Sequence, residues 1–176
     1  MRFSRVYFVI AVCTLLFVCG ASGEDFDVVM ARAKRGDIEA QCDVAYMYEK
    51  GNGVEQNYSK AAEWYLKAAK RGFSQAQNNL GVLYHDGKGV KKDYKKAREW
   101  YLKAAEQYNG AAFGNLGWIY EHGQGVSVNY KKAIDYYIKG AAQDNLRSAN
   151  QLGWLYEHGL GTSVNYQEAI KWYTIA

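Results

Sequence analysis

The residues best suited to chemistry are two histidines in equivalent surroundings. His122 and His158 lie 36 residues apart, and each stands in a Glu-His-Gly triplet. A tetrahedral metal site needs several ligands at about 2 Å from one ion, and one ligand per copy of a repeat cannot close it. A histidine at the C-terminal end of a helix is favourable for the helix dipole without any metal. We therefore predict no metal site and no cofactor.

Catalytic arrangements are equally sparse. Glu121 and Glu157 could form a carboxylate pair, but they are equivalent positions of a repeat and are expected at the surface. Cys42 has no activating partner visible in the sequence, and no serine lies in a nucleophile elbow. The Gly-x-Gly steps end helices, whereas phosphate-binding glycine loops begin them. The chain is therefore predicted not to be an enzyme.

A period of 36 residues organises the chain. Glycines and tyrosines recur at this spacing without insertions, at Gly51, Gly87, Gly123 and Gly159, at Gly53, Gly89, Gly125 and Gly161, and at Tyr65, Tyr101, Tyr137 and Tyr173. Such periods are typical of stacked helical repeats, which need about three units to bury a continuous core. We divide the chain into units 37–72, 73–108, 109–144 and 145–176, the last being incomplete.

Each unit contains two helical patterns. In unit one, Ala40, Val44, Met47 and Tyr48 lie on one face of a first helix, and Gly51 ends it. A second helix with a stripe of tyrosines and alanines then follows an N-cap residue, which is Asn57, Asp93, Asn129 or Asn165 in the four units. The first helices of the later units carry a glycine in mid-helix, at Gly81, Gly117 and Gly153. Because a mid-helix glycine costs about 1 kcal/mol against alanine, we expect another helix to pass too close for a Cβ.

A degenerate second helix is expected before the first unit. Val28, Val29 and Ala33 stand one period before apolar positions of the second helix of unit one. Residues 24–36 are therefore predicted to cover the N-terminal end of the stack. The predicted fold is all-α, a solenoid of stacked helix–turn–helix repeats.

These motifs resemble the Sel1-like repeat family of the tetratricopeptide superfamily. The family pattern is present in unit two as Leu80-Gly81, Tyr84, Gly87, Gly89-Val90, Asp93-Tyr94, Ala97, Trp100-Tyr101 and Ala104-Ala105. Unit one departs from it with Val44-Ala45, and unit four has Thr162 in place of the valine. The resemblance covers residues 37–176.

The resemblance implies a right-handed α-solenoid whose first helices line a concave groove. Family members are mostly adaptors that assemble protein complexes, which implies a protein or peptide partner. One cysteine-rich bacterial branch is linked to β-lactam binding, which leaves a small-molecule-binding or hydrolytic protein as an alternative. The paired cysteines of that branch are absent here, so its activity is not transferred to this chain.

The partner is expected on the side of each first helix that faces away from the core stripe. Helical geometry places repeat positions 43, 46, 49 and 50 on that side. We name this surface the first-helix face and predict that it comprises Tyr46, Asn79, Asn115, Trp118, Glu121, Gln151, Trp154 and Glu157. Trp118 and Trp154 are the candidate anchors, since tryptophans with polar neighbours are common at binding hot spots. The alternative is that both rings pack on the neighbouring repeat. Asn79 and Asn115 are either clamps for a peptide backbone or ordinary solvated amides.

The N-terminus has the pattern of a secretory signal peptide, residues 1–23. Arg2 and Arg5 precede an uncharged apolar run, and Ala21-Ser22-Gly23 supplies small residues for cleavage. The run is short for a membrane span, which needs about 20 apolar residues, so no stable span is expected after cleavage. The predicted location is secreted, periplasmic or in the lumen of the endoplasmic reticulum. Loss of the two arginines lowers the net charge from +4 to +2, which gives no reason to expect nucleic acid.

Self-association is the remaining alternative. After cleavage Cys42 would be the one cysteine left, either as an inert buried thiol or as a bridge to a second copy. The C-terminal end of the stack, with no polar capping helix after Ala176, offers a second route to a homodimer.

Overall fold

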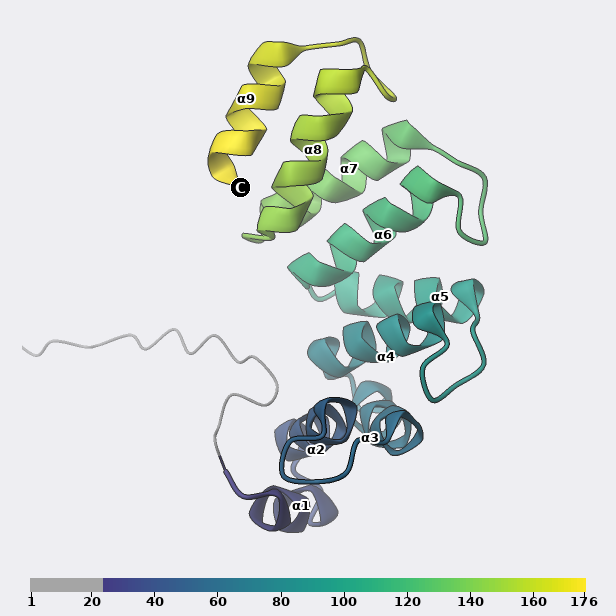
Figure 1. The fold of residues 1–176 in the computed structure, drawn as a ribbon, viewed down its shortest axis with the longest axis vertical. Coiled ribbons are helices and arrows are strands. Elements are labelled where there is room, and N and C mark those ends of the chain that lie inside the picture. Colours follow the sequence, from purple (N-terminus) through teal and green to yellow (C-terminus); the bar gives the residue numbers. More distant parts are fainter. Residues whose placement is uncertain (1–23) are drawn as a thin grey trace, which may run out of the picture.

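A computed structural model describes residues 24–176, and this part of the chain folds into nine α-helices and no strand. The helices are α1 Phe26–Lys34, α2 Ile38–Lys50, α3 Tyr58–Lys70, α4 Ser74–Asp86, α5 Tyr94–Ala105, α6 Gly110–His122, α7 Tyr130–Ala141, α8 Leu146–His158 and α9 Tyr166–Ile175. They stack as helix pairs along one curved line from α1 to α9 (Figure 1). The predicted all-α solenoid is confirmed. The predicted signal peptide lies outside the described residues.

The ends of the helices follow from the residues that the sequence singled out. The side chains of Asn57, Asp93, Asn129 and Asn165 each accept a hydrogen bond from the backbone N–H three residues on, at 2.9–3.1 Å. Each first helix ends at a left-handed glycine, Gly51, Gly87, Gly123 or Gly159. The predicted caps are therefore confirmed in all four units.

The mid-helix glycines make room for tyrosine rings. A Cβ on Gly81 would lie 2.6 Å from the ring of Tyr101, and one on Gly117 would lie 2.5 Å from Tyr137. Both tyrosines are almost completely buried. The close approach expected from the sequence is thus made mainly by the tyrosine of the second helix in the same unit.

Buried glutamines join units one and two to the helix that precedes each of them. The Gln41 amide donates to the carbonyl of Ala33 at 3.2 Å, and the Gln77 amide donates to the carbonyl of Ala69 at 3.1 Å. In this way the first helix of a unit satisfies a carbonyl at the end of the preceding helix. Helix α1 packs against α2 and buries Val29 and Ala33.

The two ends of the stack differ. No helix follows α9 among the described residues, and its Tyr173 is 39% exposed although the equivalent Tyr65, Tyr101 and Tyr137 are buried. The indole N–H of the neighbouring Trp172 is buried without a hydrogen-bond partner. Across residues 24–176, no helix is long and apolar enough to cross a membrane.

Candidate partner-binding face

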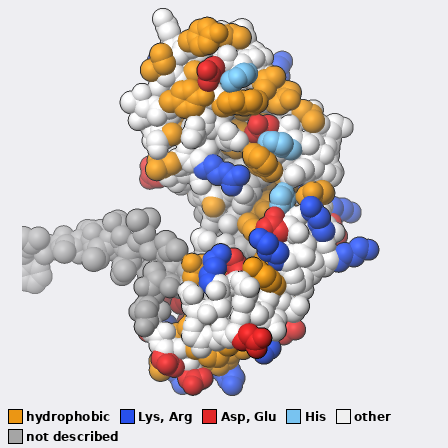
Figure 2. Space-filling model, viewed as in Figure 1, with side chains coloured by type: hydrophobic (Ala, Val, Ile, Leu, Met, Phe, Trp, Pro, Cys, Tyr) orange, Lys and Arg blue, Asp and Glu red, His pale blue; other side chains and the backbone are white. Residues whose placement is uncertain are grey.

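The two anchor tryptophans form matched stacks with histidines. Trp118 stacks on His122 with ring centroids 3.6 Å apart, and Trp154 stacks on His158 at 4.5 Å. In each pair the histidine Nδ1 also lies within hydrogen-bond distance of the tryptophan carbonyl, at 3.1 and 2.9 Å. Trp154 is 38% exposed as a residue, whereas Trp118 is half-buried. Figure 2 shows hydrophobic side chains and histidines gathered over the part of this face formed by α6 and α8.

The glutamates of the first-helix face are held by tyrosines of the second helices. The hydroxyl of Tyr137 donates to Glu121 at 2.6 Å, and that of Tyr173 donates to Glu157 at 2.7 Å. In unit one, Tyr65 donates to Glu49 at 2.9 Å. We call this pair the tyrosine–glutamate lock. Glu121 is only 8% exposed, so its main contact is within its own unit.

The locks keep the tyrosines protonated. Burial, the first cause, and the neighbouring carboxylates Glu49 and Glu121 raise the pKa of Tyr65 and Tyr137 above the ordinary range. Gln151 of α8 lies beside Tyr137 and acts in the opposite direction on this pKa. A neutral phenol is the donor that the locks require.

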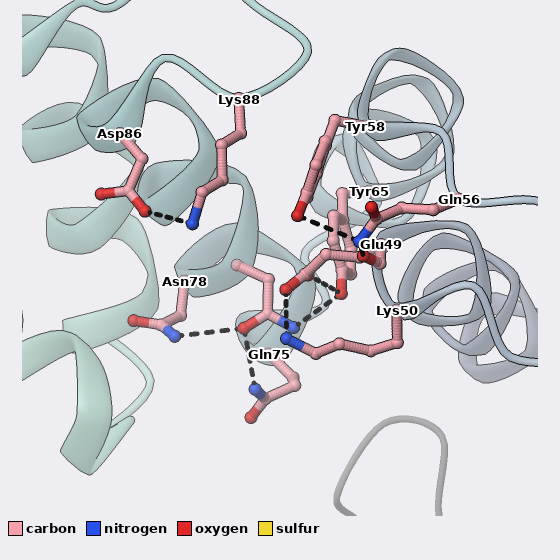
Figure 3. A network of polar contacts seen from close by, with 10 residues as sticks. Glu49, Lys50, Gln56, Tyr58, Tyr65, Gln75, Asn78, Asp86 and Lys88 are labelled. Carbon is pink, nitrogen blue, oxygen red and sulfur yellow. Dashed lines mark hydrogen bonds and ion pairs between the residues drawn. The ribbon is translucent and has the colours of Figure 1, made fainter.

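The two asparagines of the face take part in a chain of amides that crosses three units. The Asn115 amide donates to Asn78 at 2.9 Å, Asn78 donates to Asn79 at 3.3 Å, and Asn79 donates to the hydroxyl of Tyr65 at 3.2 Å. Figure 3 shows the unit-one end of this network around Tyr65 and Glu49. Both predicted clamp residues therefore already make hydrogen bonds within the protein, which sets their orientation.

Tyr46 lies apart from the other aromatic residues of the face. Its ring is half-buried against the N-terminal part of the core, and the Lys50 ammonium lies 5.5 Å from its centroid. Cys42, on the same helix, is fully buried at 0% exposure.

Two residues of the face, Asn115 and Trp118, line a cavity of about 270 Å³ between α4, α5, α6 and α8. The cavity is completed by His85, at a repeat position expected on the first-helix face, and by Tyr101 and Arg147, which the sequence analysis did not select as binding residues. The one available signal was a break in the repeat, because His85 occupies the position that holds glutamate in the other units. Among the described residues, no group of three or more His, Cys, Asp or Glu side chains could hold a metal ion.

Stacked helix pairs, with a buried second-helix stripe and a first-helix face of differing side chains, define an α-solenoid repeat protein. The sequence pattern of the Sel1 repeat matches residues 38–73, 74–109, 115–145 and 146–176. The chain therefore belongs to the Sel1 repeat family, whose members are generally scaffolds for protein interactions. No functionally curated protein matches the chain in sequence.

Solved structures of bacterial repeat proteins share the fold. A protective antigen of uropathogenic Escherichia coli with an SLR fold is 40% identical, with a TM-score of 0.79, and the match covers 85% of this chain and 32% of the antigen. A Sel1 repeat protein of Oxalobacter formigenes is 34% identical, with a TM-score of 0.80, over 85% of this chain and 61% of that protein. Cysteine rich protein B of Helicobacter pylori is 25% identical, with a TM-score of 0.54, over 71% and 90% of the two chains. The chain thus spans about a third and about three fifths of the first two proteins.

Proposed function

We propose that the first-helix face binds a segment of a partner protein. The apolar stripe of the second helices is already part of the core, since Tyr65, Tyr101 and Tyr137 are almost completely buried. The first-helix face carries the side chains that differ between units, and it combines aromatic rings with oriented amides. Membership of a family of interaction scaffolds supports this role.

The observation that carries the proposal is the exposed ring of Trp154. A large apolar surface left in water is costly, and stacking on His158 holds the ring in one orientation before any partner binds. Trp118, on the first helix of the preceding unit, stacks on His122 in the same way. Rigid aromatic side chains of this kind contribute much of the binding free energy in protein interfaces.

The test is site-directed photo-cross-linking in the source cells. A photo-reactive phenylalanine analogue replaces Trp154 in the full chain, and the matched control replaces Ile138 on α7, which is 39% exposed. We expect one discrete partner to be captured from position 154 and not from position 138. Mass spectrometry of the cross-linked peptide then identifies the partner segment. Equal capture from both positions, or none from position 154, would overturn the proposal.

We also propose that the protein is exported, by virtue of the signal peptide pattern in residues 1–23. The mass of the protein isolated from its source tests this point. A mature chain that starts at or just before Glu24 supports export, and a chain that retains Met1 to Gly23 contradicts it.

A further inference from the structure

The tyrosine–glutamate lock is missing from unit two. His85 replaces the glutamate, and neither of its ring nitrogens contacts the Tyr101 hydroxyl. Its Nδ1 lies 2.8 Å from Asp86 and its Nε2 lies 2.6 Å from Gln124. Tyr101 is only 2% exposed as a residue, and its hydroxyl makes no hydrogen bond with another described residue, yet this oxygen is not among the fully buried polar atoms. In the other three units a glutamate accepts the hydrogen bond of the equivalent tyrosine hydroxyl, so the Tyr101 hydroxyl remains available to a ligand.

Tyr101, which carries this unused hydroxyl, lines the cavity of about 270 Å³. Arg147, at the start of α8, lines the same cavity, and its guanidinium lies 5.3 Å from the centroid of the Trp118 ring. No carboxylate within residues 24–176 forms an ion pair with Arg147. Arginine and a neutral phenol are both hydrogen-bond donors, so the cavity offers two donors on helices from different units.

One carboxylate also lines the cavity, but its charge is already compensated. Asp86 pairs with Lys88 at 2.9 Å and lies 2.8 Å from His85 Nδ1. Although burial opposes this, the hydrogen bonds from His85 and Lys88 hold the pKa of Asp86 below its ordinary value. Asp86 is therefore ionised and neutralised by Lys88, which leaves the Arg147 charge for a ligand.

We propose that this cavity binds a carboxylate of the partner segment, held by the Arg147 guanidinium and the Tyr101 hydroxyl beside the Trp118 ring. An ionised carboxylate only accepts hydrogen bonds, which fits two donors that have no acceptor partner among the described residues. The inference rests on the proposed function, since it names the chemical group that the first-helix face recognises. The carboxylate is either an acidic side chain or a chain terminus.

The probes are three immobilised mixtures of acetylated hexapeptides. The first has free C-terminal carboxylates and contains no Asp or Glu, the second is amidated and contains one Glu, and the third is amidated with neither. We expect the labelled full chain to bind the first or the second mixture at least about tenfold more tightly than the third, as for a charge-assisted hydrogen bond. The mixture that binds shows which source of carboxylate is used.

Four variants test the residues. His85→Glu should rebuild the lock on Tyr101 and abolish the preference for carboxylate, with a thermal midpoint no lower than that of the wild type. Arg147→Gln should abolish the preference as well. Tyr101→Phe should weaken binding about tenfold, because it removes one donor to a charged group. Tyr137→Phe is the matched control, and it should keep the full preference because its hydroxyl is used by Glu121.

The carboxylate site is overturned if the third mixture binds as tightly as the other two, or if none binds. It is also overturned if folded His85→Glu retains the preference. These outcomes are separable from the proposed function. Cross-linking from position 154 that persists while the peptide preference is absent removes only the carboxylate site, and loss of that cross-linking removes the proposed function itself.

Discussion

At the scale of single residues, one substitution separates unit two from the other units. Glu49, Glu121 and Glu157 each accept a hydrogen bond from the tyrosine of their own unit, and His85 makes no such contact. The tyrosine at this position therefore has two roles. In three units its hydroxyl joins two helices, and in unit two only its ring contributes to packing.

This difference predicts unequal effects of the same mutation. Tyr137→Phe leaves the 8% exposed Glu121 carboxylate without its donor, so we expect the free energy of unfolding to fall by about 2 kcal/mol. Tyr101→Phe removes a hydroxyl without a partner and should change it by less than about 0.5 kcal/mol. Urea denaturation of both variants measures the difference. Similar losses in the two variants would show that the lock contributes nothing beyond the ring.

At the scale of elements, the loop after each first helix adds a contact with the helix of the preceding unit or, in unit one, with α1. A Cβ on Gly89, in the loop after α4, would lie 2.2 Å from the carbonyl carbon of Tyr58 at the start of α3. The equivalent Gly53 faces α1, and its nearest neighbour is the Phe26 Cβ at 3.4 Å. Both glycines have nearly the same positive φ, +70° and +68°. They therefore share the conformational requirement and differ only in the available space.

We therefore expect Gly89→Ala to be more destabilising than Gly53→Ala. Each substitution costs about 1–2 kcal/mol for a left-handed alanine. Gly89→Ala adds a clash with backbone that cannot rotate away, so the loss should exceed that of Gly53→Ala by at least about 1 kcal/mol. Thermal and urea unfolding of the two variants give the comparison. Equal losses would mean that the loop moves away from Tyr58 at little cost.

The elements were predictable because each has a local cause. The N-caps such as Asn57 and the terminal glycines such as Gly51 lie at fixed places in the period, and the structure confirms them. The contacts between helices were less accessible. The sequence contains the change from glutamate to His85, but its effect on Tyr101 is clear only once the tyrosine–glutamate lock of the other units is known. Arg147 belongs to unit four, two units after Tyr101 in the chain. A cavity between three units depends on side-chain directions that a one-dimensional pattern does not contain.

At the scale of the whole molecule, a row of buried tyrosines runs along the core, and we call it the tyrosine ladder. Tyr65, Tyr101 and Tyr137 recur one unit apart and are almost fully buried. Burial is the first cause that raises the pKa of each, and nearby carboxylates act in the same direction. In the unfolded chain the same phenols ionise near pH 10. The folded state thus resists an ionisation that the unfolded state permits.

The sign of the resulting pH dependence is determined by this difference. A group whose pKa is raised by folding contributes stability below its unfolded pKa and loses it as the pH rises towards the folded value. We expect the urea midpoint of the full chain to stay constant between about pH 8 and about pH 10 and to fall at higher pH. Tyrosinate absorbance should rise together with unfolding, because these phenols ionise once the helices separate. Tyr137→Phe carries one fewer such group and should show a shallower alkaline decline. A midpoint unchanged to about pH 11, or an equal decline in Tyr137→Phe, would contradict the assignment of this pH dependence to the tyrosine ladder.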